Sequence, residues 1–422
     1  MFAPWLLATL ALAYLGLLFA VAWLGDRLAA AGRSPVPRPW VYALSLAVYC
    51  TSWAFYGTSG QSATLGWALP PTYVGTLVLL LVFLPLLDKL IRVSRRERIT
   101  SVADFVAARY GRDRALAVSV TLIAVCSVVP YIALQLKGID LSFNELATGN
   151  APRVGEDTAL YVAATLALFA VLFGTRHVEA TEHHPGMMLA VAFESVVKLV
   201  AFLAVGAFAT FGLFDGFGDL AAQAALLPRD PPVSATSHYL ALAVLGFFAI
   251  FCLPRQFHVA VVENGGPRDL ALARWVFPAY LLAISIFILP IANAGRVLGL
   301  PDADLFVLSL PLAAGQDGLA LLAFIGGLSA ATGMVIVASV ALSTMICNEI
   351  AVPLLMRFAP ALRTGRDLTG LLLSIRRIAI VLLLTLAWLY YRWIAQQNAL
   401  ASIGEIGMAA AALFGPAIVA GL

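Results

Sequence analysis

Long apolar segments alternate with short polar connections along the whole chain. A helix needs about 20 residues to cross the hydrocarbon of a bilayer, because each residue rises 1.5 Å. Eleven segments reach or approach that length. They cover residues 3–25, 40–58, 70–91, 113–136, 157–175, 187–214, 237–253, 270–294, 317–348, 370–394 and 398–422. The pattern therefore predicts an all-α integral membrane protein with about eleven transmembrane helices.

Composition agrees with a lipid bilayer as the main surrounding of the chain. Apolar residues make up 62% of the 422 residues and charged residues 12%, whereas a soluble domain carries roughly 25% charged residues. Basic residues are spread over short connections and form no single patch, which argues against nucleic acid as a partner. The four cysteines lie in apolar segments at spacings that fit neither a metal site nor a disulfide framework.

The positions of Lys and Arg predict the orientation. Connections after odd-numbered segments hold twenty of them, Arg255 included, and the other connections hold five, Lys137 included. Since short cytoplasmic loops are enriched in Lys and Arg, we expect the N-terminus outside and the C-terminus in the cytoplasm. The last apolar segment runs to Leu422, and we expect the natural protein to continue beyond it.

Two segments contain residues that do not suit a continuous helix. Polar residues interrupt the second segment from Thr51 onward, although an ordinary loop after that helix explains them equally well. Pro254 ends the seventh segment, and proline removes a backbone donor and disrupts the preceding turn. If the first helix is set aside, the two interrupted helices open two halves of five helices each. Such breaks in inverted repeats mark the solute site of a secondary transporter.

This interpretation divides the chain and selects candidate residues. The predicted parts are an extra N-terminal helix with its loop (1–38), a first repeat (39–214), an extracytoplasmic connector (215–236) and a second repeat (237–422). The candidate solute-binding residues are Thr51, Ser52, Trp53, Tyr56, Gln135, Gln256 and His258. For Gln135, a packing hydrogen bond is an equally good interpretation.

Charged and hydroxyl side chains inside the apolar segments are candidates for ion coupling. Glu194 and Lys198 are four residues apart and share one helix face. A charge at mid-bilayer costs roughly 2.5–3.5 kcal/mol on insertion scales, so the pair should face protein or a water-filled cavity. The two charges could simply neutralise each other, or Lys198 could stand in place of a cation and exchange protons. Ser329 and Thr332 share a face of the ninth segment and are the best hydroxyl candidates there.

Neither a metal nor a cofactor is expected. One predicted cytoplasmic loop contains His177, His183 and His184 with two glutamates, but the spacing is not diagnostic of a metal site, and we interpret it as a solvated loop. A Gly-rich phosphate loop and a nucleophile elbow are absent from the sequence, and we identify no catalytic residue.

Four stretches of the chain carry a family resemblance. They are 44–57, 99–111, 130–137 and Leu253-Pro254-Arg255-Gln256-Phe257-His258 followed by Val262-Glu263-Asn264. Together they resemble the sodium/solute symporter family, and more narrowly the symporter-like sensor module of bacterial transporter-fused sensor histidine kinases. The resemblance covers essentially the whole chain. It implies the leucine-transporter-type 5+5 inverted repeat, preceded by one extra N-terminal helix.

The resemblance also implies a function. It suggests a solute-binding sensor or transport module for an amino acid such as histidine, in the bacterial inner membrane. Its cytoplasmic kinase domains, acting as a homodimer, would follow Leu422; within the 422 residues there is no kinase domain. The alternative is a stand-alone secondary transporter coupled to a cation or to protons.

The family's ion site is altered in this chain. In the family, sodium lies between the second helix, near Tyr49 to Trp53 here, and hydroxyls around Ser329 and Thr332. Sodium symporters carry an aspartate near the position of Tyr49 and adjacent hydroxyls on the ninth helix. This chain has Ala331 beside Thr332 instead. We therefore expect Lys198 to replace the ion, while a proton and sodium both stay open as the coupling ion.

Overall fold

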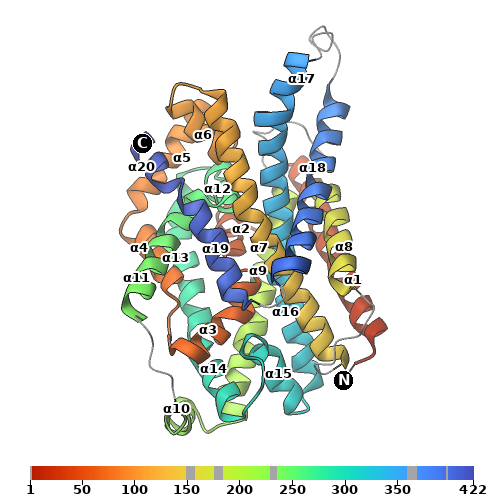
Figure 1. Ribbon diagram of the computed structural model, residues 1–422, viewed down its shortest axis with the longest axis vertical. Helices are drawn as coiled ribbons and strands as arrows, with labels where there is room; N and C mark the ends of the chain where they lie inside the picture. The colour runs from red at the N-terminus through yellow and green to blue at the C-terminus, as the bar shows by residue number, and fades with distance from the viewer. Residues whose placement is uncertain (1, 149–156, 175–183, 229–234, 359–367, 396–397) are drawn as a thin grey trace.

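The computed structural model describes residues 2–148, 157–174, 184–228, 235–358, 368–395 and 398–422. Every element in these residues is a helix (Figure 1). The two ends of the chain lie toward opposite ends of the long axis (Figure 1). One end of the bundle holds α5 (Leu84–Glu97), which carries Arg95, α6 (Val102–Arg109) and Leu422 (Figure 1). We call it the basic end, and the charge distribution predicts that it faces the cytoplasm.

The first half of the chain begins with an unbroken helix and continues with an interrupted one. α1 (Pro4–Ala30) is followed by α2 (Arg38–Ser45), η1 (Leu46–Tyr49), η2 (Trp53–Gly57) and α3 (Thr58–Leu65). The remaining elements of this half are α4 (Pro71–Leu81), α5 (Leu84–Glu97), α6 (Val102–Arg109), α7 (Arg114–Thr148), α8 (Thr158–Gly174), α9 (Pro185–Ala207) and η3 (Phe208–Gly212).

The second half has an interrupted helix at the matching place. After α10 (Phe217–Ala225) come α11 (Ala235–Cys252), α12 (Pro254–Phe257) and η4 (His258–Val262). The elements that follow are α13 (Pro267–Ser285), α14 (Ile288–Val297), η5 (Ala303–Leu305), α15 (Phe306–Ala313), α16 (Asp317–Met345), η6 (Ile346–Ala351), α17 (Val352–Phe358), α18 (Thr369–Tyr390), η8 (Tyr391–Ala395), α19 (Leu400–Ala412) and α20 (Gly415–Gly421).

The expected number of eleven spans is not confirmed by length and composition. In the described residues, seven helices are long and apolar enough to cross a membrane, or nine if two bent pairs each count as one span. The bent pairs are α4 with α5, at 72°, and α11 with α12 and η4, at 51°. The other two predicted spans fall short because 38–65 is divided by its break and α8 has only 17 residues. The boundaries of the two repeats stay a prediction.

Close helix contacts hold the interrupted helices in place. α11 packs along α4, α16 along α9, and α19 along α7 (Figure 1). A Cβ on Gly75 would overlap Ala243 O, and one on Gly246 would overlap Thr72 O, so glycine is required where α4 and α11 meet. Such small residues allow close approach of helices within a membrane. The helix that bears the second break is therefore fixed against α4.

Candidate site at the two helix breaks

The first break lies within the second predicted span. The 3-10 turn η1 ends at Tyr49, Cys50 is extended (φ −79°, ψ 94°), and helical structure resumes around Trp53. The predicted interruption is thus confirmed, and the alternative of an ordinary terminal loop is wrong. Because the hydrogen-bond ladder stops here, carbonyls on the η1 side keep acceptor capacity: Ala47 O accepts the Cys50 N–H at 3.0 Å and has a second lone pair.

Lys198 fills the space beside those carbonyls. Its ammonium Nζ donates to Ala47 O at 2.6 Å and to Cys50 O at 2.8 Å. The side chain comes from α9 and is only 3% exposed. A fixed cation therefore lies where the broken backbone offers oxygen ligands.

Glu194 shares the α9 face with Lys198 but takes a different partner. Thr332 Oγ1 on α16 lies within hydrogen-bonding distance of Glu194 Oε1 and of Leu328 O, and these two acceptors share its single proton. A Cβ on Gly333 would overlap the other carboxylate oxygen, so the glutamate fills the groove along α16. Both charges face protein, as predicted, and each is satisfied by a neighbouring helix.

The structure separates Ser329 from Thr332. The Ser329 hydroxyl lies 2.5 Å from the Tyr14 hydroxyl of α1 and also bonds to Ile325 O. Although the two hydroxyls are one turn apart, one contacts the extra N-terminal helix and the other contacts Glu194. The sequence did not predict a role for Tyr14, because its neighbours in the sequence are ordinary apolar residues of a membrane span.

One face of α7 lies against both breaks. Gln135 Oε1 accepts the backbone N–H of Ser52 at 2.9 Å, and its Nε2 donates to Tyr131 O at 2.9 Å. Gly138, one turn further on, leaves room for Ser52, whose Cβ would lie 2.8 Å from a Cβ placed there. Both halves of the Gln135 amide are used within the protein. Gln135 thus positions the first break through a packing hydrogen bond.

The second break places an unexpected cation in the core. Leu253 is extended (ψ 125°) and Pro254 starts α12, so Arg255 follows directly after the break. Its side chain is 1% exposed, and its guanidinium carbon lies 4.4 Å from the centroid of the Tyr131 ring. The sequence analysis counted Arg255 as a loop residue, which is wrong. Its burial could not be predicted, because polar Gln256 follows it directly and a basic residue after a proline usually marks the end of a membrane span.

Lys137 was also assigned to a loop, and the structure corrects this too. It lies in α7, is 6% exposed, and its Nζ donates to Ala395 O at 3.0 Å. The long helix α7 continues well past the predicted end of its segment at residue 136, which is why the side chain is inside the protein.

Several buried polar atoms around the breaks have no hydrogen-bond partner among the described residues. They include Ser52 Oγ, Trp53 Nε1, Gln256 Oε1, and Nε and Nη1 of Arg255, whereas the Tyr131 hydroxyl interacts with Arg255 and the Tyr56 hydroxyl with Ser142. An unmade hydrogen bond on a buried group costs about 1–3 kcal/mol. Native proteins accept this cost mainly where a ligand or water completes the bonds. The concentration of such atoms makes the breaks the candidate binding site.

The other predicted solute residues lie around the same breaks, with one exception. Thr51 is buried, Trp53 packs against Gly404 of α19, and Gln256 Nε2 reaches Leu46 O at 3.5 Å, which links the two broken helices. The exception is His258, which points toward the basic end of the bundle, where its Nε2 lies 3.4 Å from Glu263 Oε1.

A polar cavity lies on the side of the breaks away from the basic end. Its volume is about 540 Å³, and Gln61, Lys137, His238, Asp304 and Glu405 are among the residues that line it. Gln61 Nε2 donates to Glu405 Oε1 at 2.9 Å, which joins α3 to α19 across the cavity. The sequence reasoning missed this cavity because its residues come from five separate parts of the chain.

Comparisons with known proteins agree with this architecture. A model described as "Sodium:solute symporter family" matches residues 30–249. The chain is 25% identical over 292 residues to a protein of Bacillus subtilis named "Uncharacterized symporter YhjB", an alignment that covers 65% of this chain and 55% of the relative. The chain thus spans about half the length of the curated relative that it matches.

A solved structure shows the same fold. It is the substrate-bound, outward-open state of a Na⁺-coupled sialic acid symporter, with a TM-score of 0.68 over 98% of this chain and 86% of that one. The sequence identity is 15%, so the likeness is one of fold. The expected fold class, a leucine-transporter-type helical membrane protein, is confirmed.

Proposed function

The chain belongs to the sodium:solute symporter family, and we propose that it binds a small carboxylate-bearing solute at the two helix breaks without sodium. In this proposal the ammonium of Lys198 takes the place of a coupling ion. Solute binding then shifts the balance between states open to either side of the membrane.

The contacts of Lys198 carry the proposal. Its ammonium donates to Ala47 O and Cys50 O, two backbone oxygens at the first break. Unwound carbonyls of this kind coordinate cations in transporters with broken helices. Because the ammonium already donates to both oxygens, a sodium ion would have to displace a buried charge to reach them.

Arg255 supports a solute with a carboxylate. Two of its nitrogens lack hydrogen bonds among the described residues, and a guanidinium binds carboxylates in a bidentate manner. No ion pair joins Arg255 to a carboxylate in the described part of the chain. A buried cation needs a partner, and a solute carboxylate would supply one. Amino acids meet this requirement, and hydroxyl and indole donors nearby could hold their other polar groups.

A kinase-linked sensor is the finer form of the proposal. The motif from Leu253 to His258 favours it, and so does the position of α19. Gly404 and Gly407 of that helix leave room for Trp53 and Tyr131, so solute-binding residues pack directly against it. α19 then leads to α20, near the end of the chain, and provides a route from the site to a cytoplasmic domain.

Uptake into proteoliposomes tests the main proposal. Labelled amino acids are offered to the purified protein with a sodium gradient and a proton gradient imposed separately. We expect saturable uptake or exchange that is the same in sodium and in choline. Strong stimulation of the wild-type protein by sodium would overturn the role given to Lys198. Lys89→Ala, at an exposed position, is the matched control for Lys198→Ala.

The sensor form is tested on the full natural product of the reading frame. ATP-dependent autophosphorylation is measured in nanodiscs with and without the solute identified by uptake. A solute-dependent change in phosphorylation supports the sensor. A natural product that ends without a kinase domain refutes the sensor form and leaves the stand-alone transporter.

A further inference from the structure

Two histidines and a glutamate meet at the basic end of the bundle. His184 precedes α9, His258 begins η4, and Glu263 follows η4. His184 Nδ1 lies 2.8 Å from Glu263 Oε1, and His258 Nε2 lies 3.4 Å from the same oxygen. One potential ligand atom from each residue lies within 4.8 Å of the other two. Segments almost 80 residues apart in sequence thus bring three metal-ligating side chains together.

We propose that His184, His258 and Glu263 form a binding site for a divalent transition metal of the Zn²⁺ class. Two imidazoles and one carboxylate are a donor set that Zn²⁺ uses in proteins. With metal–ligand distances of about 2.0–2.2 Å, tetrahedral donors lie about 3.3–3.6 Å apart. The distances between the potential ligand atoms here are 2.8 Å, 3.4 Å and at most 4.8 Å. Small side-chain movements would bring all three into the tetrahedral range.

His258 gives an independent indication of a missing ligand. Its side chain is 5% exposed, yet its Nε2 makes no hydrogen bond within the described residues. The nearby Glu263 oxygen, at 3.4 Å, is too poorly oriented to serve as a hydrogen-bond partner. Histidine binds a metal as the neutral imidazole, through a ring nitrogen whose lone pair is not used in another bond.

Surrounding contacts hold the carboxylate in position. The backbone N–H of His184 approaches both Glu263 carboxylate oxygens, at 3.1 and 3.2 Å. Arg38 Nη2 donates to the Glu263 carbonyl at 3.2 Å, and the Glu263 N–H donates to His258 O at 2.9 Å. Groups that orient a ligand in this way raise metal affinity.

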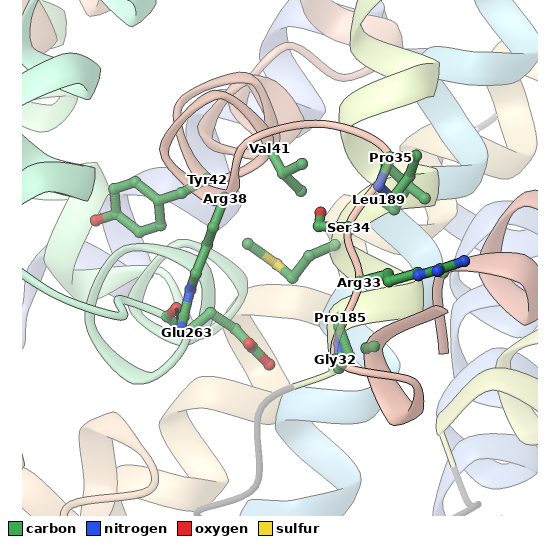
Figure 2. A pocket seen from close by; sticks show the side chains of 13 residues that line it. Gly32, Arg33, Ser34, Pro35, Arg38, Val41, Tyr42, Pro185, Leu189 and Glu263 are labelled. Carbon is green, nitrogen blue, oxygen red and sulfur yellow. Dashed lines mark hydrogen bonds between the residues drawn. The ribbon is translucent and has the colours of Figure 1, made fainter. Parts of the chain in front are cut away.

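A cavity provides access and room for a fourth ligand. Glu263 lines a space of about 650 Å³ between the loop after α1, the start of α2 and the start of α9. Figure 2 shows Glu263 beside Arg38 at one side of this cavity and Pro185 at the start of α9. Water could enter from the cavity and occupy the open coordination position of the metal.

The position of the site gives the metal a structural consequence. His258 begins η4, the inner part of the interrupted helix of the second half, and Glu263 directly follows it, whereas His184 directly precedes α9, which carries Lys198. A bound metal would fasten the inner part of the broken helix to α9 at the basic end. The metal would then favour conformations closed at that end. This inference does not depend on the identity of the solute.

Metal titration of the purified chain tests the proposal directly. After treatment with EDTA, the protein is titrated with Zn²⁺ against a chromophoric chelator, and Co²⁺ absorption reports the coordination geometry. We expect one Zn²⁺ per chain, a tetrahedral Co²⁺ spectrum, and a rise in the thermal unfolding midpoint. Loss of a group that only orients a ligand costs about 10–100-fold in metal affinity, so loss of one ligand in His258→Ala or Glu263→Gln should weaken affinity by at least that much.

The control is His238→Ala, since this half-exposed histidine lines the polar cavity on the other side of the breaks. It should bind Zn²⁺ as the wild type does. Wild-type protein that takes up no stoichiometric Zn²⁺ would overturn the proposal, as would binding unchanged in His258→Ala/Glu263→Gln. If that double variant does not fold, the Co²⁺ spectrum of the wild type decides, because an octahedral spectrum or none excludes the proposed ligand set.

Discussion

Replacing Lys198 with alanine should convert a sodium-indifferent protein into one that responds to sodium. The substitution removes the ammonium that donates to Ala47 O and Cys50 O. These oxygens stay in the core, and Glu194, whose charge interacts with Lys198 on the same helix α9, stays there too. The space left behind therefore combines backbone oxygens with a nearby negative charge, which suits a small cation.

The expected loss of stability follows from the two bonds that disappear. A hydrogen bond to a charged group contributes roughly 1.5–3 kcal/mol, and breaking a buried charge arrangement costs about 3–5 kcal/mol. We expect Lys198→Ala to be destabilised by about that amount. Sodium at 100 times its dissociation constant would restore about 2.7 kcal/mol.

Thermal unfolding in nanodiscs measures the effect. The unfolding midpoint of Lys198→Ala should rise as choline is replaced by sodium at constant ionic strength, whereas the wild type and Lys89→Ala should not respond. The reasoning is refuted if the folded variant shows no sodium response, or if sodium stabilises the wild type to the same degree.

Three further substitutions test other parts of the structure. Arg255→Gln should reduce solute affinity by at least tenfold, as measured by competition with labelled solute. The control Arg268→Gln, at an exposed position, should have no effect. Equal loss of affinity in both variants would argue against a carboxylate site. Gly246→Ala forces α11 away from α4 and should lower the unfolding midpoint, whereas Gly16→Ala, where a Cβ meets no atom within 4 Å, should not. Thr332→Val removes the hydroxyl that donates to the α9 carboxylate and should destabilise the protein by about 1–3 kcal/mol in chemical unfolding; an unchanged midpoint would show that this bond contributes little.

Much of the architecture was predictable because the membrane imposes strict rules on sequence. All eleven apolar segments contain helix, and both interruptions fall where Thr51 and Pro254 indicated. Lys198 stood out since a lysine within an apolar helix is rare and needs a partner. Its partners could not be predicted, because the carbonyls of Ala47 and Cys50 become available only through the precise geometry of the break.

The parts that sequence reasoning missed depend on contacts between distant segments. Arg255 follows a proline near the predicted end of a helix, where a basic residue usually marks the membrane boundary, so its burial was hidden. The pairing of His184 with Glu263 joins two loops whose approach depends on the packing of the whole bundle. Hydrophobic periodicity contains no information on such pairings.

The contacts of Lys198 also bear on the energy available for transport. An ion that dissociates on one side of the membrane carries the free energy of its gradient into the cycle. A cation bonded covalently to α9 completes every cycle in the protein and transfers no net charge. If Lys198 takes the place of the coupling ion, as proposed, and no group at the site releases a proton, no ion gradient drives the cycle; the protein would then equilibrate or exchange its solute, and its occupancy would report the solute concentration itself.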